Sequence, residues 1–134
     1  MLKRELTADL GDERLTLVAT FRASMEVAEK VGDPLLIARE AALEAMFSGL
    51  GRNYEPKFKF SMRNVPVIIH IGTSAAGDKR SLSDIEDLVF GVGIIKAQDL
   101  ATRYVAMIIE PKSEEINKDL ATDAQSKKDN KPGE

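Results

Sequence analysis

The sequence predicts a mainly helical α+β domain, in which an N-terminal β-hairpin packs on four or five helices and a disordered C-terminal tail follows. Three features carry this prediction. In residues 2–19, apolar and polar side chains alternate on both sides of a Gly-Asp-Glu turn. Beyond them, apolar side chains recur at helical spacing between capping residues and glycines. The residues after 110 are almost entirely polar, so we divide the chain into one domain, residues 1–110, and a flexible charged tail, residues 111–134.

The expected hairpin reverses at Gly11, whose permissive backbone suits a tight turn. In the second strand, Leu15 and Leu17 alternate with Arg14 and Thr16. This period of two predicts a hairpin with one face on a core and the other in water.

Capping residues and glycines delimit the expected helices. Thr20 precedes the first helix, and Gly32 is its expected stop. Asp33 and Pro34 suit the N-cap and the first position of the second helix. The other expected boundaries are Gly49 and Gly51 after the second helix, the capping-box pair Ser81 and Asp84 before the fourth, Gly91 and Gly93 after it, and Pro111 after the last.

The stretch between the second and third helices has a strand-like pattern. Phe58 and Phe60 alternate with Lys57 and Lys59, which predicts a short third strand over Lys57–Phe60. The alternative is an extended loop that the two phenylalanines pin to the domain.

Residues 70–81 resemble a phosphate-binding loop of the form G-x-x-x-x-G-K-[ST]. Gly72 and Gly77 have the required spacing, but Asp78 stands where the motif needs lysine, and its carboxylate would repel phosphate. Lys79 comes one residue late. The competing interpretation is a helix over residues 64–77, with Ser61 or Asn64 as its cap, Pro66 in its first turn and Gly77 as its left-handed stop. We expect the helix.

Composition argues against several functional classes. The net charge is −3 and there is no tryptophan, so we expect no nucleic-acid binding. No apolar run approaches the ~18 residues of a membrane span, and the first residues have no signal-peptide pattern, so we expect neither membrane nor export. Cysteine is absent, which excludes disulfides and thiolate metal sites.

The sequence offers no constellation of catalytic groups. His70 is the only histidine and lies in an apolar segment, without the spacing of a metal-ligand pair. Adjacent acids such as Glu86 and Asp87 point about 100° apart on a helix, so they do not face one substrate. We therefore expect a non-enzymatic binding or assembly module with no catalytic residue, cofactor or metal.

The chain has a two-part layout. The first part is a charged hairpin that runs into a helix, and its characteristic positions are Gly11, Asp12, Arg14, Leu15, Leu17, Thr20, Phe21, Ala23, Met25 and Glu29. The second part is an apolar helix, Ala-Ala-Gly, a polar link and two further helices, with Ala75, Ala76, Gly77, Leu82, Ile85, Leu88, Gly93, Leu100 and Val105 at its characteristic positions. This layout resembles the tail assembly chaperones of the gene-transfer-agent gene product ten family and of related long-tailed phages.

The resemblance covers about residues 2–110 and implies an assembly role. Proteins of this kind bind the tape-measure protein, keep it soluble and bring tail-tube subunits to it in the bacterial cytoplasm, and they are absent from the mature particle. The contact surfaces that we expect are the hairpin edge, with Leu15 and Leu17, and the aromatic link, with Phe58, Phe60 and Met62. A free strand edge also allows a homo-oligomer.

Two alternative functions, and two interpretations of the tail, remain open. The chain could be a nucleotide-binding or regulatory enzyme subunit that uses the degenerate Gly72–Ser81 loop, or a structural tail component that stays in the particle. The tail could be a solvated end, or a tether that folds on a partner.

Overall fold

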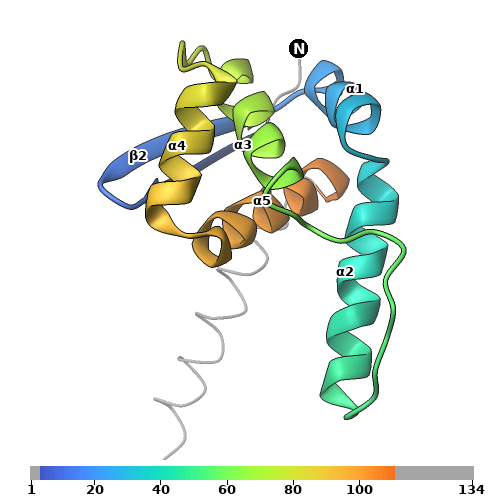
Figure 1. Cartoon of the computed structure of the whole chain (residues 1–134). Coiled ribbons are helices and arrows are strands. Elements are labelled where there is room, and N and C mark those ends of the chain that lie inside the picture. Colours follow the sequence, from blue (N-terminus) through green and yellow to red (C-terminus); the bar gives the residue numbers. More distant parts are fainter. Residues whose placement is uncertain (1–3, 111–134) are drawn as a thin grey trace, which may run out of the picture.

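A computed structural model of the 134-residue chain describes residues 4–110, so the prediction for the tail, 111–134, lies outside the described residues. The fold class is confirmed: an N-terminal antiparallel hairpin packs on five helices (Figure 1). The elements are β1 (Arg4–Leu10), β2 (Glu13–Ala19), α1 (Phe21–Lys30), α2 (Pro34–Gly49), α3 (Asn64–Ala75), α4 (Leu82–Val92) and α5 (Ile94–Ile109).

The hairpin forms in the register that its turn sets. Arg4 pairs with Ala19 and Leu10 with Glu13, and Gly11 takes a φ of 66° in the turn, as predicted. Leu15 and Leu17 are completely buried, so the inner face of the hairpin is part of the core.

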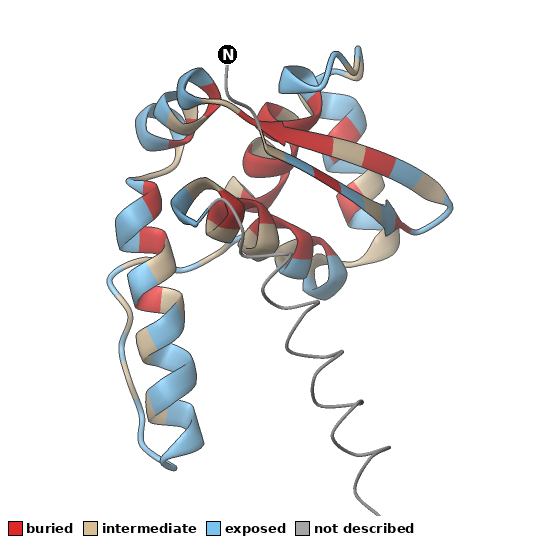
Figure 2. Cartoon of the chain, turned by 180° about the vertical axis from the view of Figure 1, so that it is seen from behind, coloured by how far each residue is buried: buried red, intermediate tan, exposed pale blue. Residues whose placement is uncertain are grey.

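Helix α3 lies at the centre of the core, between the hairpin and α5 (Figures 1 and 2). Seven of its residues are buried, Val65, Pro66, Ile68, Ile69, Ile71, Gly72 and Thr73. Gly72 lets α3 approach β2 and α5 closely, because an added Cβ would lie 2.8 Å from Cδ2 of Leu17 and 2.9 Å from Cε1 of Tyr104. The Tyr104 hydroxyl donates a 2.8 Å hydrogen bond to the carbonyl of Val18, which ties α5 to β2.

The helical interpretation of residues 64–77 is confirmed. The segment that a phosphate loop would need as a strand is helical, and Gly77 follows with a φ of 89°. Ser61 Oγ accepts hydrogen bonds from the backbone N–H groups of Arg63 and Asn64, while Asn64 Oδ1 accepts one from Ser61. These bonds fix the turn just before α3, but the N-cap position is Arg63 and receives no side-chain hydrogen bond, so neither predicted residue is the N-cap itself.

Other predicted caps are also present. Thr20 Oγ1 accepts from the backbone of Ala23, and Asp33 Oδ1 accepts from that of Leu35, with Pro34 opening α2. Ser81 and Asp84 form the reciprocal capping box, which lowers the pKa of the Asp84 carboxyl through hydrogen bonds from Ser81.

The predicted third strand is wrong. In the described part of the chain the sheet has two strands, and Lys57–Phe60 belongs to an irregular segment, residues 50–63, which we call the strap. The strap runs back along α2, which extends beyond the rest of the domain (Figure 1). The backbone N–H of Lys57 bonds to the carboxylate of Glu40 on α2, so it is not available to a strand ladder.

Candidate functional site

Helix α2 has an unusual distribution of polar and apolar side chains. Its only polar side chains are Arg39, Glu40, Glu44 and Ser48, and the last three follow one stripe at intervals of four residues. Glu40 bonds to the strap, and Glu44 and Ser48 line a cavity beside it. Glu40 is therefore held against protein, whereas Glu44 and Ser48 are exposed at the mouth of the cavity. On other sides of α2, Leu35, Leu36 and Met46 are exposed apolar side chains.

Burial decreases along α2. The buried residues of α2 are Pro34, Ile37 and Glu40, all in its first half. From Ala41 to Gly49 every residue is half-buried or exposed, as the pale outer end of the helix in Figure 2 shows. A helix that is apolar on nearly all sides is normally buried, so α2 carries more apolar surface than its own domain covers.

The strap holds the polar stripe through a buried carboxylate. Glu40 is only 2% exposed, and its Oε1 accepts hydrogen bonds from the Tyr54 hydroxyl at 2.8 Å and from the Lys57 backbone at 2.6 Å. These bonds, from Lys57 first, lower the pKa of the Glu40 carboxyl below its ordinary value. The Tyr54 ring also stacks on Phe47 of α2, with 5.1 Å between the ring centroids.

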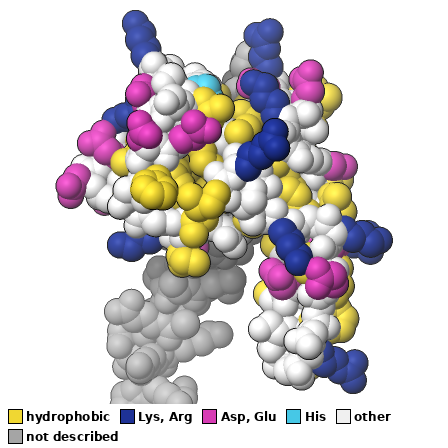
Figure 3. All heavy atoms as spheres, viewed as in Figure 1, with side chains coloured by type: hydrophobic (Ala, Val, Ile, Leu, Met, Phe, Trp, Pro, Cys, Tyr) yellow, Lys and Arg dark blue, Asp and Glu magenta, His cyan; other side chains and the backbone are white. Residues whose placement is uncertain are grey.

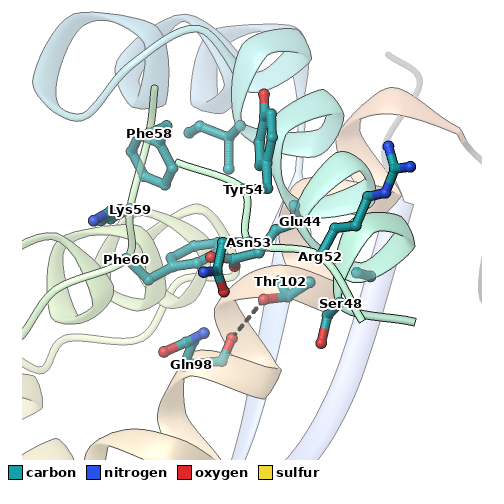
Figure 4. Close-up of a pocket in the computed structure, with 13 residues that line it drawn as sticks. Glu44, Ser48, Arg52, Asn53, Tyr54, Phe58, Lys59, Phe60, Gln98 and Thr102 are labelled. Atoms are coloured by element: carbon teal, nitrogen blue, oxygen red, sulfur yellow. Dashed lines mark hydrogen bonds between the residues drawn. The ribbon is translucent and has the colours of Figure 1, made fainter. Parts of the chain in front are cut away.

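A groove separates α2 and the strap from α5. Its wider part is a cavity of about 730 Å³ in which Asn53 of the strap points toward Gln98 and Thr102 of α5 (Figure 4). The remaining lining residues of this part are Ile37, Ala41, Glu44, Ala45, Ser48, Arg52, Tyr54, Phe58, Lys59 and Phe60.

The second part of the groove is almost purely apolar. This hollow of about 280 Å³ shares Ile37, Ala41, Phe60 and Thr102 with the first part, and it is otherwise lined by Ala38, Ala42, Val105 and Ala106. The small alanine side chains on both helices would let the backbone of a bound segment approach α2 and α5 closely. The groove thus has one apolar end and one end with uncharged polar groups and charges of both signs.

No histidine is among the described residues that line the groove. Residues 4–110 contain no cluster of three or more His, Asp or Glu side chains that could hold a metal ion. His70 lies on α3, where its Nε2 is 3.2 Å from Ser74 Oγ within the same helix. Within the same range, no helix is both long enough and apolar enough to cross a membrane.

The predicted contact residues fall into two groups. Phe58 and Phe60 line the groove, half-buried, with their rings packed edge to face at 5.2 Å, and Met62 is 51% exposed at the end of the strap. Leu15 and Leu17 are core residues and present no side-chain surface to a partner in this structure. Burial of their apolar area against α3 is the physical reason.

Sequence reasoning missed the outward face of α2. Leu35, Leu36, Met46 and Leu50 are exposed large apolar side chains on this helix and at its end. The signal was present, because residues 34–49 have apolar side chains nearly all round the helix, but that pattern normally indicates burial within the domain.

Comparisons with protein-family models, with characterised proteins and with solved structures gave no match to this chain.

Proposed function

We propose that the protein is a non-enzymatic assembly chaperone for a phage-type tail, which binds a helical client, the tape-measure protein, through α2 and the adjoining groove. The observation that carries this proposal is the outer half of α2, which is apolar and has no buried residue. Exposed apolar surface of this kind marks sites of protein association.

The shape of the site suits a helix. The 16 residues of α2 span about 24 Å at ~1.5 Å per residue, and α5 has the same number of residues. A third helix laid between them would bury an apolar stripe against Ala38, Ala42 and Ala106, as amphipathic helices do in grooves. A tape-measure protein is long and helical, so it would offer many such stripes.

The role further includes bringing tail-tube subunits to the client in the cytoplasm of a bacterial host, without incorporation into the mature particle. The layout of the chain, from the hairpin to α5, supports this part through its resemblance to tail assembly chaperones. A structural component of the tail would instead remain in the particle, and mass spectrometry of purified particles separates these two roles.

Co-purification with the tape-measure protein of the same genome tests the proposal. We expect the tagged chain to retain the tape-measure protein and to raise its soluble yield. Ala42→Glu places a carboxylate in the apolar hollow and should weaken binding on the order of tenfold or more, because a charge buried in an apolar contact is costly.

A matched control is Ala28→Glu. Ala28 is an exposed alanine on α1 and lines none of the cavities described above, so this variant should bind like the unmodified chain. Absence of any association, or equal effects of the two variants, would contradict the proposed function.

A further inference from the structure

A second apolar surface lies where α4 meets α5, and we call it the corner patch, defined by Phe90 and Ile95. These side chains are 79% and 78% exposed, and they flank a turn at Gly93, whose φ is 108°. Figure 3 shows hydrophobic side chains gathered on this face, over the lower part of α4 and the start of α5. Gly91, next to Phe90, is exposed, and the space beyond its Cα is open.

Three carboxylates lie close to the corner patch. Glu86 precedes Phe90 by one helical turn on α4, and Asp99 follows Ile95 by one turn on α5, so each acid neighbours one of the apolar side chains. Asp87 precedes Gly91 in the same way. All three acids are exposed, and none forms a salt bridge within residues 4–110.

A hollow extends this acidic surface toward the hairpin turn. It has a volume of about 490 Å³, with Leu88 and Val92 among its apolar walls and Asp12 and Asp87 at its edges. Lys96 is the one cation that lines it. A partner for this surface would therefore need an apolar side chain for the centre and positive charge for the predominantly negative rim.

We propose that the corner patch is a docking face for a partner segment that carries an apolar anchor between basic side chains. The anchor would cover Phe90 and Ile95, and the basic groups would neutralise Glu86, Asp87 and Asp99. Complementary charge at the rim of an apolar contact steers association and rejects partners of the same sign.

A second copy of this chain does not fit the same face. A two-fold contact centred on the corner patch would gather Glu86, Asp87 and Asp99 of both copies, six acids in all, around one apolar contact, with the two Lys96 side chains as the cations from the adjoining hollow. Like charges across an interface cost several kcal/mol, which makes a basic partner of different sequence the occupant.

This docking face goes beyond the proposed function, because it is separate from the groove that would receive the helical client. The corner patch and α2 lie on opposite sides of the domain, and α5 joins them (Figure 1). The start of α5 contributes Ile95, whereas Thr102, Val105 and Ala106 line the groove. Two partners could therefore bind at the same time.

Three labelled octapeptides test the docking face by fluorescence anisotropy with the full chain at low salt. The first has Phe-Leu between two groups of three lysines, the second has glutamates in place of the lysines, and the third has Ser-Ser in place of Phe-Leu. We expect the first peptide to bind at least about tenfold more tightly than either of the others, since the site requires both charge and an apolar anchor.

Two pairs of variants locate the binding. The double variant E86K/D87K should weaken binding of the first peptide at least about tenfold, whereas E5K/E29K, with the same change in net charge at exposed acids elsewhere, should weaken it less than about threefold. The double variant F90S/I95S should weaken binding by a similar factor, whereas F21S/M25S, which removes exposed apolar side chains from α1, should not.

Circular dichroism verifies that each variant is folded, which we expect because every substituted side chain is exposed. Equal binding of the three peptides, or equal effects of the corner variants and their controls, would overturn the docking face. Neither result would bear on the groove, because Ala42→Glu tests the client site independently.

Discussion

Replacement of Gly72 by alanine tests the packing of the central helix. An added Cβ would lie 2.8 and 2.9 Å from the Cδ2 and Cβ atoms of Leu17 and 2.9 Å from Cε1 of Tyr104. Both neighbours are completely buried, so neither can move aside without disturbing the core.

The size of the effect follows from two opposing contributions. Overpacking of a core costs about 1–3 kcal/mol, and three close contacts with buried groups place this case near the upper value. Alanine in place of glycine inside a helix returns up to about 1 kcal/mol. We therefore expect Gly72→Ala to lower the free energy of unfolding by about 2 kcal/mol, or the melting temperature by roughly 10 °C.

Urea denaturation followed by circular dichroism measures this change, with Gly91→Ala as the control. Gly91 is also helical, but no atom lies within 4 Å of its Cβ position, so the control should be neutral or stabilising by up to about 1 kcal/mol. If Gly72→Ala were as stable as the unmodified chain, the close approach of α3 to β2 would be refuted.

Three further substitutions test individual contacts. Glu40→Gln removes the charge that holds the strap, so hydrogen exchange at the Lys57 amide should accelerate on the order of tenfold. Because the folded pKa of Glu40 is lowered, protection of that amide in the unmodified chain should be full above pH 4.5 and should be lost as the pH falls through the lower, folded value. Ser81→Ala removes the cap of α4 and should lower the free energy of unfolding by about 1 kcal/mol in urea titration. Tyr104→Phe should cost about 1 kcal/mol in the same measurement, because the carbonyl of Val18 loses its hydroxyl donor.

The starts of three helices could be predicted, because they depend on residues close together in the sequence. Thr20, Asp33 and Ser81 cap helices because their side chains bond to backbone groups two or three residues away. Asp78 excluded the phosphate loop for a similarly local reason, since a carboxylate occupies the position where the motif needs lysine.

The strap could not be predicted because its partner is remote in the sequence. The alternation of Phe58 and Phe60 is compatible with a strand, but the Glu40 carboxylate, 17 residues before Lys57, takes the backbone group that a ladder would need. Only the tertiary arrangement of α2 and the strap reveals that competition.

Only part of the candidate site could be predicted, because the sequence does not show which apolar surfaces other elements cover. Phe58 and Phe60 were expected at a contact surface and do line the groove, whereas α2 was not among the expected contact surfaces. Its composition does not reveal how much of its apolar surface the remaining helices cover. Leu15 and Leu17 were expected at a contact surface but are buried in the core. The alternating pattern of a strand does not distinguish these two outcomes, because it shows only that one face is apolar.

The most direct test of the central proposal is hydrogen exchange of the chain with and without the tape-measure protein. We expect the client to slow exchange in the outer half of α2, residues 41–49, and in α5 around Thr102–Ala106, while exchange in α1 is unchanged. Slower exchange confined to other elements, or no change in α2 at saturating client, would refute binding of the client at α2 and the groove.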